Sequence, residues 1–550
     1  MHAYIPRDLF PRYVKRNDFM AVKNFGVLLD CSRNAVMKTE NILRFVDKIK
    51  KLGYNLLELY TEDTYALDGE EYFGYGRGRY SKTEMKAINT YCVENGVELV
   101  PCIETLGHLE KIFEWEHYAP VNDCDGVLLV GDERTYALID KMFAFCADCF
   151  TSRKINIGMD EAHRLGLGNY LRLNGYKNRF DIFLRHLERV TEIAKKYGFK
   201  PMIWSDMFFR IATGGEYVAP DADLDKELLS KVPEGVAVAY WDYFTQEEAV
   251  YEKMLKKHFE FGREVWFAGS AVKCCGFHSA NEISLDRLSK SLGACAKQNV
   301  ENILITLWSD GGAECSATAV LPTLTYAAEA VKGNYDVENA KKVFGEVFKG
   351  NWDDFLLCDL SDMPFPRQDD IGTGAKEMLY SDYFCGRFNN FVSLTGKERK
   401  TYARYAEKFA EAAERNNAYG YLFRFYCSLS KVLAEKYDLG ALSRFYYRSG
   451  QKNKLKKLIG RYKKVEKLLT PLIEAFKIVW MKENKPHGFE THEIKLGGLL
   501  ERTKSCRKRI AAYVTGEIDG IEELEDDFIA HEPMMPYKNS YVYIASVNTI

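Results

Sequence analysis

The sequence of 550 residues has no apolar run long enough to cross a membrane, and its first residues lack the basic head and apolar core of a signal peptide. Its 76 Lys and Arg residues nearly balance 79 Asp and Glu residues, which gives a net charge of -3. Such a balance provides no global attraction to nucleic acids or membrane surfaces. These absences predict a cytoplasmic protein with neither a nucleic-acid nor a membrane partner.

Metal-binding patterns are also lacking. The fourteen cysteines are spread thinly over the chain, and without a secretory signal we expect them to be free thiols. Cys146 and Cys149 form one C-x-x-C pair, but no second pair and no H-x-x-x-H motif accompany it. We therefore expect neither a metal nor another cofactor.

The first 330 residues alternate short apolar strands with amphipathic helices. In residues 40–51, for example, apolar side chains recur on one helical face. Eight such units match the number and size of a TIM barrel, and the Gly-rich first turn of an open doubly wound sheet is missing after Asp30. The predicted fold is an α/β (β/α)8 barrel. Its expected strands are residues 25–30, 55–60, 97–103, 154–160, 201–204, 236–241, 264–268 and 302–308.

From about residue 335 onward the strand-like runs disappear. Residues 397–415, 421–437 and 454–480 have the periodicity of amphipathic helices. We predict two domains: a barrel with a short N-terminal extension over residues 1–334, and an α-helical C-terminal domain over residues 335–550. Residues 541–544 are expected to form a strand or a disordered end.

Polar residues at the predicted strand ends are the main functional signal, because the active site of a TIM barrel lies at the carboxyl ends of its strands. Asp160 and Glu161 end the fourth strand, where two adjacent carboxylates cost desolvation and mutual repulsion. Paired carboxylates with separated pKa values are the usual groups that cleave a glycosidic bond. The other strand ends carry Asp30, Arg33, Glu62, Asp63, Glu104, His108, Asp206, Asp242 and Asp310.

Three of the seven tryptophans, Trp204, Trp241 and Trp308, also fall at strand ends. Aromatic rings stack on the apolar faces of a sugar, while carboxylates and an arginine bind its hydroxyls. Each tryptophan alone is equally well explained by core packing. The three together, beside carboxylates, favour a pyranose pocket, so the expected partner is a small oligosaccharide or glycoside.

This pattern resembles glycoside hydrolase family 20, the β-N-acetylhexosaminidases. The chain is most similar to compact intracellular members, which have a helical C-terminal domain and lack the small α/β domain that usually precedes the barrel. The resemblance implies exo-acting hydrolysis of terminal β-linked N-acetylglucosamine or N-acetylgalactosamine, and the choice between these sugars stays open. The matching motifs lie within residues 20–330: Asp30-x-x-Arg33, Tyr60-Thr61-Glu62-Asp63, Leu106-Gly107-His108, Gly158-Met159-Asp160-Glu161 and Leu307-Trp308-Ser309-Asp310.

The resemblance also implies roles for individual residues. Glu161 is the expected general acid/base, and Asp160 is expected to orient the 2-acetamido group. The acetamido oxygen then attacks the anomeric carbon to give an oxazolinium-type intermediate, so no enzyme nucleophile is needed. The remaining expected roles are distal hydroxyl binding by Arg33 and Asp310 (commonly Glu in the family), walls of the acetamido pocket from Trp204, Trp241 and Trp308, and a supporting pair of His108 and Asp63.

One departure from the family concerns the seventh strand. The family usually has a Tyr-x-Asp motif after that strand, in which the tyrosine donates a hydrogen bond to the acetamido oxygen. Residues 268–276 read AGSAVKCCG and contain neither residue. Tyr240 or Tyr243, near the sixth strand, is the expected substitute.

Other functions stay open at this point. An O-GlcNAc hydrolase also pairs a barrel with helices, but its adjacent catalytic residues are usually two aspartates. A non-catalytic carbohydrate-binding barrel would not need an intact acid. If the enzyme used an ordinary carboxylate nucleophile, the candidates would be Glu104, Asp206 and Asp242. The oligomeric state is also open, with a homodimer as one alternative.

Overall fold

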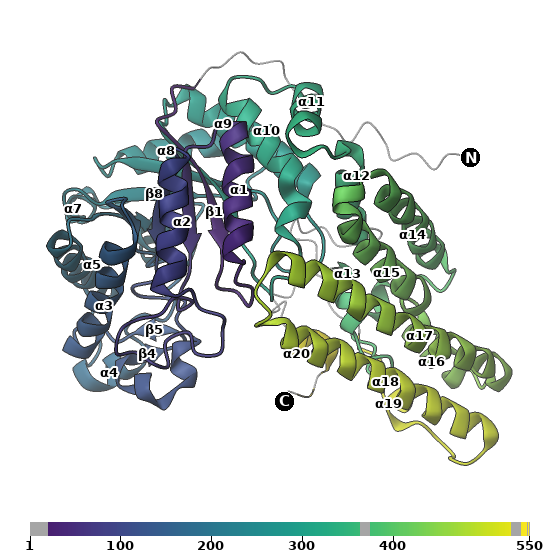
Figure 1. Ribbon diagram of the computed structural model, residues 1–550. Helices are drawn as coiled ribbons and strands as arrows, with labels where there is room; N and C mark the ends of the chain where they lie inside the picture. Colours follow the sequence, from purple (N-terminus) through teal and green to yellow (C-terminus); the bar gives the residue numbers. More distant parts are fainter. Residues whose placement is uncertain (1–19, 363–373, 530–540, 547, 549–550) are drawn as a thin grey trace.

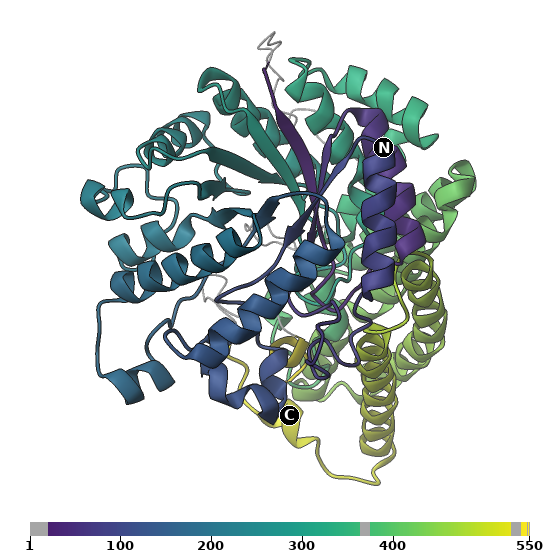
Figure 2. The same ribbon diagram turned by 60° about the vertical axis from the view of Figure 1, so that its left-hand side comes forward.

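Eight parallel strands close into a barrel (Figures 1 and 2). The computed structural model describes residues 20–362, 374–529, 541–546 and 548. The strand order is β1-β10-β9-β8-β7-β6-β3-β2, and β1 pairs with both β2 and β10. The predicted barrel is thus confirmed, and an open sheet is excluded. The strands are β1 (Asn24–Asp30), β2 (Leu56–Tyr60), β3 (Glu98–Cys102), β6 (Lys154–Asn156), β7 (Lys200–Trp204), β8 (Ala237–Trp241), β9 (Val265–Ser270) and β10 (Asn302–Leu307).

Side chains alternate between the barrel interior and the layer under the helices, as the two-residue period of a strand requires. In β8, for example, Ala239 belongs to the interior cluster, whereas Val238 and Tyr240 belong to the surrounding core. Trp241 and Trp308 pack against the interior cluster at the strand ends. The cluster itself consists of Leu28, Leu56, Tyr60, Val100, Cys102, Met202, Trp204, Ala237, Ala239, Trp266, Ala268 and Leu304.

Amphipathic helices surround the barrel. Helix α1 (Thr39–Leu52) buries the apolar face predicted from its spacing and ends at Gly53, whose φ of 100° a glycine adopts without strain. Helix α2 (Lys82–Glu94) begins at Ser81, which forms a capping box with Glu84. A hairpin of β4 (Asn122–Cys124) and β5 (Val127–Leu128) is also present, which the sequence does not predict. The other helices of the barrel domain are α3 (Glu133–Cys149), α4 (Asn169–Asn174), α5 (Arg179–Lys196), α6 (Asp206–Thr213), α7 (Lys226–Ser230), α8 (Glu248–Phe259), α9 (Asn281–Lys297) and α10 (Leu321–Val331).

The described residues after α10 are mostly helical and lie to one side of the barrel (Figure 1). The predicted helices near 397–415, 421–437 and 454–480 are confirmed. The expectation for residues 541–544 is wrong, because they form a helix that packs Tyr541 against Tyr380 (ring centroids 5.1 Å). The helices are α11 (Val337–Phe348), α12 (Trp352–Leu356), α13 (Gly374–Tyr380), α14 (Lys397–Arg415), α15 (Gly420–Lys436), α16 (Leu439–Arg448), α17 (Lys452–Glu483), α18 (Phe489–Thr515), α19 (Glu522–Glu525) and α20 (Tyr541–Ala545).

The helical domain contacts the barrel through the segment that joins β1 to α1. The Lys485 backbone N–H donates to the Val36 carbonyl (2.8 Å), and Lys38 Nζ donates to the Met481 carbonyl (2.6 Å). The loops that follow β1 and its neighbour β10 therefore lie within reach of the helical domain.

Over the parts of the chain that the structure describes, no helix is both long and apolar enough to cross a bilayer.

Candidate active site

Arg33 lies at the centre of a carboxylate cluster at the ends of β1, β2 and β10. Barrel closure makes β1 and β10 neighbours, so the residues that follow them meet despite their separation in sequence. Arg33 contacts Asp30 (Nη1–Oδ2 3.2 Å), Glu62 (Nε–Oε1 2.9 Å) and Asp310 (Nη1–Oδ1 3.5 Å). The Asp310 side chain is 42% exposed, so it stays accessible to a ligand. The structure thus brings Arg33 and Asp310 together.

A continuous aromatic surface adjoins this cluster. The guanidinium carbon of Arg33 lies 5.0 Å from the centroid of the Trp308 ring, which in turn lies 6.1 Å from that of Trp204. Trp308 Nε1 donates to the Tyr243 hydroxyl (2.7 Å), and Tyr243 stacks on Trp241 (centroids 5.4 Å, 29°). The three predicted tryptophans and Tyr243 are therefore held side by side.

Asp160 and Glu161, although adjacent in sequence, occupy different surroundings. The Asp160 side chain is only 12% exposed, while that of Glu161 is 38% exposed. His108 Nε2 lies 3.2 Å from Asp160 Oδ2 and 3.8 Å from Glu161 Oε2. Asp160 Oδ1 is buried without a hydrogen-bond partner among the described residues, so it can accept a hydrogen bond from a ligand.

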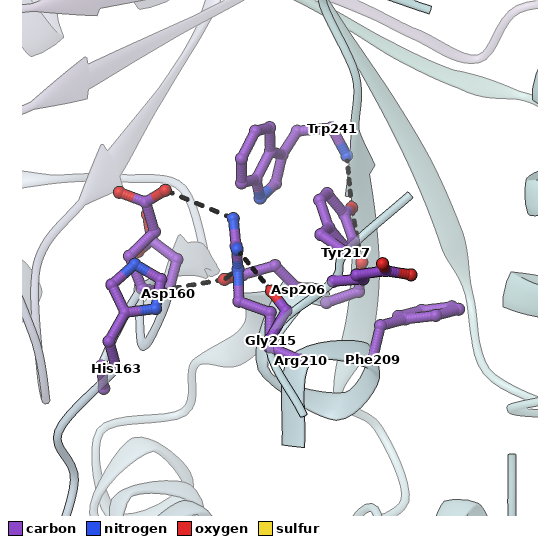
Figure 3. A network of polar contacts seen from close by, with 12 residues as sticks. Asp160, His163, Asp206, Phe209, Arg210, Gly215, Tyr217 and Trp241 are labelled. Carbon is purple, nitrogen blue, oxygen red and sulfur yellow. Dashed lines mark hydrogen bonds and ion pairs between the residues drawn. The ribbon is translucent and has the colours of Figure 1, made fainter. Parts of the chain in front are cut away.

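Arg210, on helix α6, holds the more exposed carboxylate (Figure 3). Its Nη2 lies 3.4 Å from Glu161 Oε1, and its Nε lies 3.0 Å from Asp206 Oδ2. The same Asp206 oxygen accepts the backbone N–H of Glu161 (3.0 Å). Arg210 and Asp206 thus position both the side chain and the backbone of Glu161.

Burial and neighbouring charges separate the pKa values of these carboxylates. Burial raises the pKa of Asp160, but His108, a backbone hydrogen bond and Arg33 together lower it by more, so Asp160 is ionised at neutral pH. Glu104 accepts the backbone N–H of Met159 (3.3 Å), and burial together with Asp160 raises its pKa well above the ordinary value. Burial and Asp160 also raise the pKa of Asp206 to about 7. Among Asp160, Glu104 and Asp206, negative charge is therefore concentrated on Asp160, as in sites that divide acid and base roles between carboxylates.

The backbone around these side chains is strained. His108, Met159 and Glu161 have positive φ angles of 54°, 69° and 47°, which cost free energy in residues other than glycine. Gly158 also has a positive φ, and a Cβ on it would lie 2.0 Å from Glu104 Oε2. Glycine is thus required there, both for the turn and for the close approach of Glu104.

Within the described residues, no three His, Cys, Asp or Glu side chains are grouped so that they could hold a metal ion. The carboxylates of the candidate site have Arg33, His108 and Arg210 as their charged partners.

Two family models match this chain. The model of the glycosyl hydrolase family 20 catalytic domain matches residues 25–259, and that of the glycoside hydrolase 20C C-terminal domain matches residues 353–542. The chain belongs to glycoside hydrolase family 20, the β-N-acetylhexosaminidase family.

Curated relatives match less of the chain. Hexosaminidase D of Homo sapiens is 25% identical over 252 residues, which are 44% of this chain and 49% of that protein. Hexosaminidase D of Bos taurus is 26% identical over 234 residues, 41% and 64% of the two chains. The chain thus spans about half to two thirds of their length. A GH20 exo-β-N-acetylglucosaminidase from Vibrio harveyi, crystallised with N-acetylglucosamine, is 14% identical with a TM-score of 0.45, over 60% of this chain and 58% of that one.

Of the two tyrosines that could replace the missing family 20 tyrosine, the structure brings only Tyr243 to the site. Tyr240 points to the outer side of β8, because side chains alternate along a strand and its neighbour Trp241 packs on the interior cluster. The Tyr240 hydroxyl donates to Asp242 Oδ2 (2.7 Å) under the helical layer. The expectation that Tyr240 lines the pocket is therefore corrected.

The expected pair of His108 and Asp63 is not formed either. Asp63 Oδ1 lies 2.9 Å from Arg77 Nη1, while His108 contacts the adjacent carboxylate pair. Glu62, the residue before Asp63, contacts Arg33 instead (Oε1–Nε 2.9 Å). The two acidic residues after β2 thus serve different partners.

The prediction from sequence names neither Glu62 nor Arg210 as a site residue. Glu62 stands in the matching motif beside Asp63, so the sequence leaves open only the direction of its side chain. Arg210 had one available signal, since it lies four residues after Asp206 and such pairs meet on a helix. That signal requires a helix directly after the fifth predicted strand, and no such helix is predicted from the sequence.

The helical domain anchors the loop that carries Arg33. Asn34, the next residue, has a positive φ of 79° and reaches across the domain boundary. Its Nδ2 donates to the Gly488 carbonyl (3.0 Å) and to Thr491 Oγ1 (2.9 Å). The position of Arg33 thus depends on the start of helix α18.

The loop that carries Asp310 is anchored by a buried ion pair. This ion pair joins Glu314 to Lys376 of helix α13. Both side chains are fully buried, and Lys376 Nζ lies 2.8 Å from Glu314 Oε2. The same ammonium donates to the Gly311 carbonyl (2.9 Å). Burial raises the pKa of Glu314, but Lys376, Lys495 and His492 together lower it by more, so the carboxylate stays ionised.

We expect Lys376→Met to destabilise the protein by about 3 kcal/mol, because removal of one partner leaves a buried carboxylate poorly compensated. The Asp310 loop loses its anchor at the same time, so KM should rise more than kcat falls. Thermal unfolding and steady-state kinetics measure the two effects. The double variant Lys376→Met/Glu314→Gln is the control and should regain much of the lost stability. An unchanged unfolding midpoint in the single variant would contradict this role of the pair.

Proposed function

We propose that this protein is an exo-β-N-acetylhexosaminidase that removes terminal β-linked N-acetylglucosamine or N-acetylgalactosamine. The observation that carries the proposal is the contrast between two adjacent carboxylates. Asp160 is buried and held ionised by His108, whereas Glu161 is more exposed and held by Arg210. The name hexosaminidase D of the curated relatives supports the same class of substrate.

In the proposed retaining mechanism the substrate supplies its own nucleophile. Asp160 accepts a hydrogen bond from the acetamido N–H, and its charge stabilises the positive charge that develops as the acetamido oxygen attacks the anomeric carbon. Glu161 gives its proton to the leaving oxygen as the glycosidic bond breaks, which leaves an oxazolinium ion. Glu161 then takes a proton from the water that attacks the anomeric carbon, and the β-configured sugar is released.

Tyr243 is the proposed donor to the acetamido oxygen. Its hydroxyl accepts a hydrogen bond from Trp308 Nε1 (2.7 Å) and, as a phenol, can also donate its own proton to a ligand. Burial raises the pKa of Tyr243, so the hydroxyl keeps that proton. Tyr243 would thus take the role of the tyrosine that the family usually has after the seventh strand.

Arg33 and Asp310 are the proposed ligands of the distal hydroxyls. Arg33 is fixed by Asp30 and Glu62, while Asp310 is exposed enough to accept hydrogen bonds from a sugar. A site closed at this end by charged side chains admits only the terminal residue of a glycan. This arrangement supports exo rather than endo cleavage.

A panel of aryl β-glycosides that differ only in the 2-substituent and in ring stereochemistry tests the proposed function. We expect hydrolysis of β-N-acetylhexosaminides, and at least about 10³-fold slower cleavage of the β-glucoside, which lacks the internal nucleophile. An oligosaccharide should release only monosaccharide from its non-reducing end. Efficient β-glucoside cleavage through a covalent enzyme-linked sugar would contradict the mechanism, and release of internal fragments would contradict exo action.

Replacement of the general acid should have an effect that depends on the leaving group. Glu161→Gln should lower the rate by about 10²–10⁴-fold on substrates with poor leaving groups, the usual size of general acid assistance. The loss should be smaller with an activated aryl leaving group, because that group departs with little protonation. Comparison of kcat/KM on an alkyl and a nitrophenyl substrate measures the difference, and equal losses would place the acid at another residue.

The assignment of Tyr243 has a matched control in Tyr240. Tyr243→Phe should reduce kcat/KM by about 10²-fold, because it removes a donor to an oxygen on which charge changes during ring closure. Tyr240→Phe removes a hydroxyl on the outer side of β8, so its kinetics should stay close to wild type. If the two variants lose activity equally, the donor is not Tyr243.

A further inference from the structure

A cavity of about 300 Å³ lies between helix α1 of the barrel and the helical domain. Its walls come from α1, from the 3-10 helix Ala317–Val320, from residues 418–421 and from the end of α17. This volume lies at the lower end of the range for small-molecule sites. No residue of the candidate active site lines the cavity, so its occupant need not be the glycoside substrate.

Three cations line this cavity: Arg44 and Lys48 from α1, and Lys482 from α17. Within the described residues, none of the three has a carboxylate oxygen within 4 Å. Lys48 and Lys482 instead lie over aromatic rings, with Lys48 Nζ 5.6 Å from the centroid of Tyr419 and Lys482 Nζ 5.0 Å from that of Tyr421. Burial lowers the pKa of Lys48, and the attraction of Glu483 offsets only part of this effect.

One carboxylate, that of Glu483, also lines the cavity, but hydroxyl groups already donate hydrogen bonds to this carboxylate. Glu483 Oε1 accepts hydrogen bonds from Ser316, Thr318 (2.7 Å) and Tyr421 (3.3 Å). Even with Glu483 ionised, three cations exceed one anion. The cavity therefore has a net charge of about +2 that the described side chains do not neutralise.

We propose that this cavity binds a small phosphate-bearing molecule, which would bridge the barrel and the helical domain. A phosphate dianion matches the unbalanced charge, and lysine and arginine are the side chains that usually hold phosphate oxygens. The cavity is partly open, and its volume suits free phosphate or a phosphorylated monosaccharide but is too small for a nucleic acid or a membrane surface. The inference does not depend on the proposed hydrolase activity.

Calorimetric titration of the full-length protein tests the site directly. The probes are inorganic phosphate, glucose 6-phosphate and glucose, so that free phosphate, a phosphate ester and the neutral sugar are compared. Binding of inorganic phosphate alone would identify the ligand as free phosphate, and tighter binding of glucose 6-phosphate would identify a phosphorylated sugar. Glucose should not bind at this site.

Two charge-removing variants and one matched control decide whether the cavity is responsible. Lys48→Met and Lys482→Met should each weaken phosphate binding by about tenfold or more, and exposed Lys482 can be replaced without loss of core packing. Lys51→Met removes an exposed charge from α1 outside the cavity and should bind as wild type does. Absence of phosphate binding to the wild type, or equal affinities for all variants, would overturn the proposal.

Discussion

The candidate site depends on the balance between clustered carboxylates and a few cations at the barrel's strand ends. If every carboxylate were ionised, their mutual repulsion in a buried region would destabilise the fold. The structure avoids this because burial raises the pKa of Glu62 and Asp206 to about 7 and also raises that of Glu104, while His108 helps to keep Asp160 ionised. The charge distribution that limits repulsion among the carboxylates at the strand ends thus also keeps Asp160 negatively charged.

Backbone strain at the fourth strand is the second constraint. The chain turns sharply after β6, so that Asp160 and Glu161 both approach His108 instead of pointing to opposite faces as adjacent residues of a strand do. That turn uses positive φ angles at Met159 and Glu161 and at the glycine before them. The Glu104 carboxylate satisfies the Met159 N–H, and the Asp206 carboxylate satisfies the N–H of Glu161. Acidic side chains with raised pKa values therefore have a structural function, since they hold the strained loop in place.

Much of this arrangement follows from the sequence. Eight apolar runs predict a parallel barrel, and a barrel requires the polar residues after its strands to meet on one face. The choice between Tyr240 and Tyr243 was also decidable, because assignment of Trp241 to the pocket places its neighbour Tyr240 on the outer side. The role of Arg210 was not decidable, since it lies on a short helix after β7 whose start depends on tertiary contacts. Likewise, nothing in the local sequence predicts that Asp63 contacts Arg77.

The topology also explains why the helical domain supports one half of the site. Because β1 and β10 are adjacent in the closed barrel and the helical domain follows α10, its helices reach the loops after those two strands. Contacts from Lys376 and from the start of α18 therefore fix the loops of Arg33 and Asp310, where the distal edge of a sugar would bind. The loop of Glu161, the proposed general acid, is held from within the barrel domain instead, by Arg210 and by Arg179, which donates to the carbonyl of Ala162 (3.3 Å). The two halves can therefore respond separately, and a change at the domain boundary is expected to alter substrate binding before it alters proton transfer.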